Sequence, residues 1–188
     1  MKKASFLALA LLMSAATYAQ TWSADKAHTK LGFTVVHLGL SEVDGVFKSI
    51  ESKVTSAKED FSDAVFELSA EIKSVSTGNE MRDGHLQKED MFNAEKFPTL
   101  TFKSTSITKV ADKKYKLVGD LTIKGVTKSY TFDLTLLGTT VDQRSKKQKV
   151  GFKATGTLNR TDFGVCNMPS MVVSNDIELR ASGEFVHE

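Results

Sequence analysis

The sequence is poor in the residues that would cross-link, interrupt or kink a small domain. Its 188 residues include one cysteine, two prolines and one tryptophan. A single cysteine excludes an internal disulfide, so an ordinary apolar core has to stabilise the chain. Scarce proline favours long strands, because proline cannot donate a hydrogen bond within a sheet. The chain also lacks GxSxG, P-loop, GxGxxG and CxxC motifs, and its carboxylates are scattered, so no nucleophile or acid–base pair is indicated.

The N-terminus has the pattern of a secretory signal peptide. Two lysines are followed by an uncharged apolar stretch, residues 4–16, and small residues precede Gln20. We therefore expect a signal peptide over residues 1–19, a periplasmic location and one mature domain over residues 20–188. An N-terminal anchor helix is the alternative, although the stretch is short for a membrane span. Without Lys2 and Lys3 the chain has 23 basic and 23 acidic side chains, which argues against a nucleic-acid partner.

Apolar and polar residues alternate through most of the mature chain, which is typical of strands with one apolar face. His37 to Leu40 interrupts the first alternating run and predicts a sharp corner, and Lys124-Gly125 predicts a tight hairpin turn. We predict about eight strands among nine extended segments, which cover residues 31–35, 41–47, 51–56, 64–72, 99–108, 115–123, 130–136, 150–158 and 177–185.

Three glycines, Gly119, Gly156 and Gly183, lie on the apolar faces of the later strands. Because glycine permits a tight bend, we predict that the strands close into an eight-stranded antiparallel lipocalin-like barrel and do not form a sandwich. A barrel of this size either encloses one small ligand or is filled by its own side chains.

One short helix is predicted near residues 79–90. Thr77 and Glu80 have the spacing of a capping box, with Thr77 as the N-cap. Met81 and His85 then lie one turn apart on the same side of the helix. Gly84 weakens the helix, so we expect it to end near Asp90.

Four sequence blocks, in order along the chain, resemble the YceI-like family of bacterial periplasmic, lipocalin-like proteins. They are HTKLGFTVVHLGLSEVDGVF at residues 28–47, DMFNAEKFPTLTF at 90–102, GDLTIKGVT at 119–127 and NRTDFGV at 159–165. The resemblance implies an eight-stranded barrel with an apolar tunnel that holds a polyisoprenoid or a similar long-chain amphiphile. It also implies that a homodimer is one state of the protein.

The predicted function is therefore non-enzymatic binding or carriage of a long isoprenoid-type lipid, such as a polyprenol or an isoprenoid quinone, with no cofactor and no metal. Burial of the tail is non-directional, so selectivity should follow length and girth. The predicted ligand-binding residues are Phe33, Val35, Phe66, Leu68, Leu121, Phe132, Phe152 and Leu179 in the tunnel, Met81, His85, Met91 and Phe92 at the mouth, and Met168 and Met171 in a late loop.

Two functional alternatives stay open at this stage. An enzyme acting on a lipid-like substrate at the mouth would use His85 or His37, and a purely structural barrel would have a filled core. Metal binding is a weaker alternative, either at Cys166 with Met168 and Met171 or at three histidines, His28, His37 and His85, since neither set has a recognised ligand spacing.

Two charged groups complete the predictions. Arg160 and Asp162, next to Asn159, are expected to form a structural salt bridge or to contact a head group. A basic connection, formed by Arg144, Lys146, Lys147 and Lys149, is either a solvated loop or a site of transient contact with an anionic membrane surface.

Overall fold

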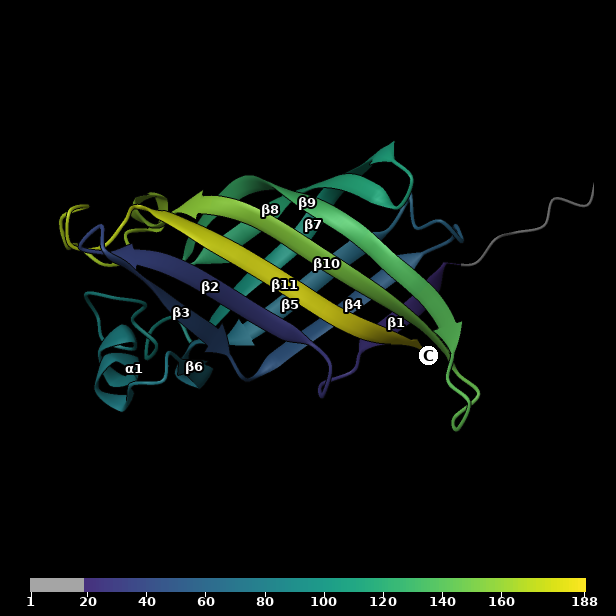
Figure 1. Cartoon of the computed structure of the whole chain (residues 1–188), viewed down its shortest axis with the longest axis horizontal. Helices are drawn as coiled ribbons and strands as arrows, with labels where there is room; N and C mark the ends of the chain where they lie inside the picture. Colours follow the sequence, from purple (N-terminus) through teal and green to yellow (C-terminus); the bar gives the residue numbers. More distant parts are fainter. Residues whose placement is uncertain (1–18) are drawn as a thin grey trace, which may run out of the picture.

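The alternating strands close into an antiparallel barrel in the computed structural model, which describes residues 19–188 (Figure 1). The predicted signal peptide, residues 1–19, therefore lies outside the described residues except for Ala19. In chain order the elements are β1 (Gln20–Ala24), β2 (Lys30–His37), β3 (Ser41–Phe47), β4 (Ile50–Ser56), β5 (Val65–Glu71), the 3-10 helix η1 (Ile72–Ser74), β6 (Val75–Ser76), α1 (Glu80–Leu86), β7 (Thr99–Ala111), β8 (Lys114–Ile123), β9 (Val126–Val141), β10 (Gln148–Asn159), the 3-10 helix η2 (Arg160–Phe163) and β11 (Asp176–His187).

The ring of the barrel has eight strands, in the order β1-β4-β5-β7-β8-β9-β10-β11, and pairing of β1 with β11 closes it. The three remaining strands extend the ring at one end, because β2 pairs with the first half of β11, β3 pairs with β2, and β6 pairs with β3. The predicted eight-stranded antiparallel barrel is confirmed. Among the described residues, no helix is long and apolar enough to span a membrane.

The two ends of the barrel differ. Figure 1 shows α1, the turn between β2 and β3 and the loop before β11 gathered at one end, which we call the helix end. The C-terminus and the connection between β9 and β10 lie at the opposite end. Both predicted turns are confirmed: Leu38 and Gly39 at the helix end, and Lys124 and Gly125 between β8 and β9, have positive φ angles.

The predicted helix cap is wrong by two residues. Asn79 caps α1, and its side chain accepts a hydrogen bond from the Arg82 N–H. Thr77 cannot begin the helix because Gly78, with φ +76°, turns the chain between them. The Thr77 hydroxyl instead donates to Asp83 at 2.6 Å. The helix also ends at Leu86, short of the predicted Asp90.

The end of the barrel opposite the helix is filled by aromatic rings. Trp22 packs edge-on against Phe61 at 5.6 Å, and Phe152 contacts Phe61, Phe66 and Phe185 with centroids 5.0–5.8 Å apart. We call these five residues the aromatic plug. All are at most 7% exposed, so this half of the interior is an ordinary packed core.

Candidate functional site

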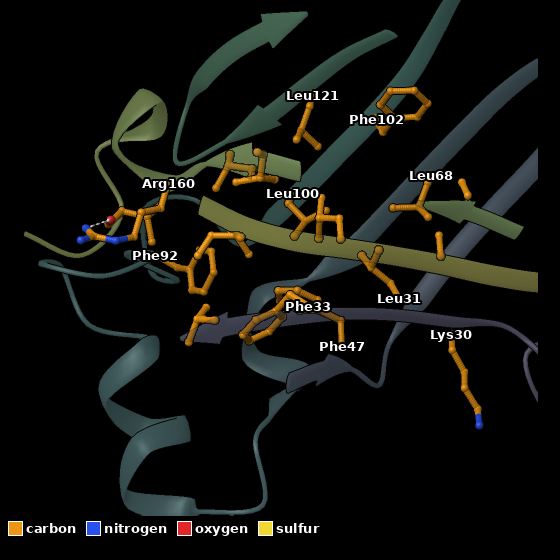
Figure 2. Close-up of a pocket in the computed structure, with 18 of the residues that line it drawn as sticks. Lys30, Leu31, Phe33, Phe47, Leu68, Phe92, Leu100, Phe102, Leu121 and Arg160 are labelled. Atoms are coloured by element: carbon orange, nitrogen blue, oxygen red, sulfur yellow. Dashed lines mark hydrogen bonds between the residues drawn. The ribbon is translucent and has the colours of Figure 1, made fainter. Parts of the chain in front are cut away.

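The other half of the interior is a cavity of about 390 Å³, within the range of small-molecule sites. Inward positions of the strands line it with aliphatic and aromatic side chains, and Figure 2 shows Leu121 on one side and Phe33 and Phe47 on the other. The ring of Phe152 in the aromatic plug lines the closed end. Exposed lining residues lie in two places: Arg82 marks the mouth at the helix end, and Lys30 lies at the start of β2, away from that mouth. The alternative of a barrel with a filled core is therefore wrong for this half of the interior.

Glycine positions allow phenyl rings to lie flat against the cavity wall. A β-carbon at Gly119 would lie 2.4 Å from Phe102 Cζ, and one at Gly156 would lie 2.5 Å from Phe132 Cδ1. The two rings contact each other edge-on at 5.4 Å. A glycine beneath an aromatic ring is a known device of curved sheets. The sequence prediction gave these glycines a role in bending, whereas the structure shows that they make room for the rings.

Twelve of the fourteen residues that we predicted as ligand-binding line this cavity. The twelve are Phe33, Val35, Phe66, Leu68, His85, Met91, Phe92, Leu121, Phe132, Phe152, Met168 and Leu179. Met81 and Met171 do not, because their side chains are 87% and 77% exposed on the outer surface of the helix end. Contact of any of the twelve with a ligand stays a prediction.

Other lining residues were not singled out from the sequence. They lie on the same alternating faces, so the period-2 pattern contained the signal: Leu31, Phe47, Leu100, Phe102, Leu117, Ile123, Leu134, Leu158 and Ile177. The pattern alone could not rank them, since it identifies the inward face of a strand but not how far along the barrel the hollow half extends.

Polar side chains gather at the mouth of the cavity. Arg82 donates from Nε to the Thr77 hydroxyl at 2.7 Å and from Nη2 to the Thr77 carbonyl at 2.9 Å. His85 Nε2 lies 3.2 Å from Asp90 Oδ2, and this hydrogen bond lowers the pKa of the Asp90 carboxyl. Thr77, Arg82 and His85 all line the cavity, as does His37 at the end of β2. A polar head group at the mouth would therefore meet both a cation and hydrogen-bonding groups.

Arg160 fastens the loop that precedes β11. It is 5% exposed, and its guanidinium donates to five backbone carbonyls, those of Val165, Cys166, Met168, Val173 and Ser174. These acceptors occupy all five donors of the side chain, and no carboxylate among residues 19–188 forms an ion pair with it. The expected salt bridge to Asp162 is wrong, because the chain turns into η2 at Arg160 and Asp162 instead accepts from the Tyr130 hydroxyl at 2.7 Å.

Comparison with known proteins identifies the family. Residues 22–185 match the YceI-like domain. The chain belongs to the YceI-like family. The UPF0312 protein SA2479 of Staphylococcus aureus is 34% identical to it over 166 residues, which cover 86% of this chain and 94% of the relative.

Solved structures of other proteins share the barrel. The YCEI protein of Campylobacter jejuni superposes with a TM-score of 0.74 at 34% identity, over 87% of this chain and 96% of that one. A polyisoprenoid binding domain from Saccharophagus degradans superposes with a TM-score of 0.67, over 90% of this chain and 99% of that one. At 12% identity, the second similarity shows a shared fold only.

This YceI-like barrel does not bring together the residues of either metal alternative. His37 and His85 border the mouth. His28 lies just before the start of β2, at the end of that strand away from the mouth, and its Nδ1 lies 3.0 Å from an Asp25 carboxylate oxygen. Cys166 is buried and lines the cavity, whereas Met171 faces outward.

One other cluster of ligand-type side chains, Asp25, His28 and Glu184, lies within the described residues. The Lys149 ammonium occupies the space between its carboxylates, at 3.4 Å from Asp25 and 3.2 Å from Glu184. Lys149 therefore belongs to this ion-pair cluster, and the rest of the predicted basic connection lies at the end of the barrel away from the mouth (Figure 1).

Proposed function

We propose that this protein binds one long-chain isoprenoid-type lipid, a polyprenol or an isoprenoid quinone, and carries it through the periplasm without chemical change. The apolar cavity inside the barrel is the observation that supports this function. A tail would lie among aliphatic and aromatic side chains, and a head group would meet Thr77, Arg82 and His85 at the mouth. This arrangement matches the division of such a lipid into tail and head.

The energy of tail burial is sufficient for tight binding. Each methylene group removed from water contributes about 0.8 kcal/mol, so several isoprene units outweigh the cost of association. The lining offers few polar partners below the mouth, and selectivity should therefore depend on the girth and length of the tail. A protein of the same fold is a polyisoprenoid binding domain, which agrees with a ligand of this class.

Native mass spectrometry of gently purified protein, followed by lipid extraction, tests this function. We expect one lipid molecule per chain, or uptake of one from vesicles that contain a polyprenol. Ala154 lines the cavity, so Ala154→Phe should fill it and abolish the bound lipid. Lys153→Phe is the matched control, because the neighbouring residue of β10 is exposed on the outer face. Wild-type protein that carries no lipid and takes none up would refute the proposal.

An enzyme acting on a lipid-like substrate is the second candidate, and the His85–Asp90 pair at the mouth favours it. A histidine oriented by a carboxylate is a common general base. Turnover of a bound quinone or ester that disappears in His85→Ala, while lipid binding persists, would support this candidate over the carrier.

A further inference from the structure

Four exposed apolar side chains surround one side of the cavity mouth. Leu38 and Leu40, in the turn between β2 and β3, are 51% and 85% exposed. Met168 and Met171, in the loop that precedes β11, are 38% and 77% exposed. We call these four residues the apolar rim. Met168 also lines the cavity, so the rim is continuous with the interior.

The two loops form one surface and are held in place. The Leu38 N–H donates to the Val172 carbonyl at 3.0 Å, and a β-bridge joins His37 to Val173. The Arg160 guanidinium holds the second loop by donating hydrogen bonds to backbone carbonyls of that loop. The two loops that carry the rim are therefore already ordered, so little conformational entropy is lost when the rim side chains become buried in a binding partner.

The rim is also uncharged. Residues 37–41 and 165–173 contain no Asp, Glu, Lys or Arg, although 26% of the whole chain is charged. Four side chains at loop tips do not form the broad, flat face, about 800 Å² on each partner, that a stable dimer needs. Apolar side chains on uncharged tips can instead enter the boundary between head groups and acyl chains of a bilayer.

We propose that the apolar rim docks the cavity mouth onto a lipid bilayer, where the protein loads and releases its cargo. This inference rests on the proposed function, because a cargo that is insoluble in water must pass between membrane and cavity. Insertion of four side chains gives weak, reversible attachment, comparable to that of a single acyl chain, and this suits a carrier that has to leave again. The two loops carry no cation, and Arg82 at the mouth is already bonded to Thr77, so attachment should not require anionic lipid.

Flotation of the purified protein with phosphatidylcholine vesicles, with and without phosphatidylglycerol, tests the docking surface. We expect flotation with both compositions. Leu40→Asp should lower the vesicle partition coefficient at least about tenfold, and the pair Leu40→Asp and Met171→Asp about a hundredfold. Val110→Asp is the matched control, because Val110 is 55% exposed on β7 near the opposite end. Both rim variants should still hold one lipid per chain in native mass spectrometry when the lipid is supplied in detergent, because Leu40 and Met171 do not line the cavity.

Three outcomes would overturn this inference. In the first, the double variant floats as well as the wild type. In the second, flotation needs phosphatidylglycerol and is lost in the variant Lys146→Glu with Lys147→Glu, which would assign the membrane contact to the basic connection. In the third, light scattering shows a dimer that the rim variants dissociate. Failure of the carrier function gives a different result, because rim-dependent flotation would then persist in protein that holds no lipid.

Discussion

The Gly156→Ala substitution should narrow the cavity by moving a phenyl ring. A methyl group at Gly156 would lie 2.5 Å from Phe132 Cδ1, whereas non-bonded carbon atoms prefer separations of about 3.5–4 Å. The Phe132 ring must therefore withdraw by about 1 Å. Phe102 packs against it edge-on at 5.4 Å, and the remaining free side is the lumen. Overpacking of this kind costs about 1–3 kcal/mol.

We expect this cost to appear as weaker ligand binding and lower stability. Titration with a fluorescent polyprenyl analogue should give a Kd at least about tenfold higher than that of the wild type, since a factor of ten corresponds to about 1.4 kcal/mol. Thermal unfolding should begin several degrees lower. Gly151→Ala is the matched control on the same strand, because a β-carbon there meets its nearest neighbour, Leu137 Cβ, at 3.4 Å. Unchanged affinity and stability in Gly156→Ala would refute the idea that this glycine sets the girth of the cavity.

Three further predictions concern the aromatic plug, the loop held by Arg160 and an ion pair on the outer surface. Phe61→Ala should lower the unfolding free energy in urea by about 3–5 kcal/mol and shift the bound lipids toward longer tails, because Phe61 belongs to the aromatic plug and contacts Phe152. An unchanged tail-length distribution would contradict this. Arg160→Met should lower the unfolding free energy by about 3 kcal/mol or more and speed hydrogen exchange in residues 165–174, because five carbonyls lose their donors. Slow exchange in this segment would contradict the role given to Arg160. The hydrogen bond from Lys109 lowers the pKa of Asp60 to about 2. The ionised Asp60 carboxylate therefore stabilises the fold above pH 4, and this contribution is lost as the pH falls through 2. Asp60→Asn should be less stable than the wild type at pH 6 and equally stable at pH 2.

Much of the fold could be predicted from the sequence because strand periodicity is a local signal. Alternation identified β2, β5 and the later strands from β8 to β11. The signal failed where elements are short. β1 has five residues and β6 has two, too few to show alternation, and tertiary pairing with β11 and β3 defines them. The helix cap was missed because two side chains, Thr77 and Asn79, both have capping chemistry, and only the backbone at Gly78 decides between them.

The sequence predicted an apolar cavity inside the barrel, but not how far along the barrel the cavity extends. Inward alternation placed most of the predicted residues at the cavity wall, yet it could not show that Phe61 and Trp22 fill one half of the barrel. Nor could it show which methionines face inward, because residues in a loop have no period. Arg160 was assigned a carboxylate partner from its spacing to Asp162, whereas its acceptors are backbone carbonyls that no side-chain pattern reveals.

Photolabelling with a polyprenol that carries a diazirine at the end of its tail tests most directly whether the hollow half of the barrel receives the lipid. The account predicts adducts on inward residues of β2, β8 and β10, near Phe33, Leu121 and Phe152, and their loss in Ala154→Phe. Adducts confined to outward-facing residues of these strands, or equal labelling of the filled variant, would contradict it.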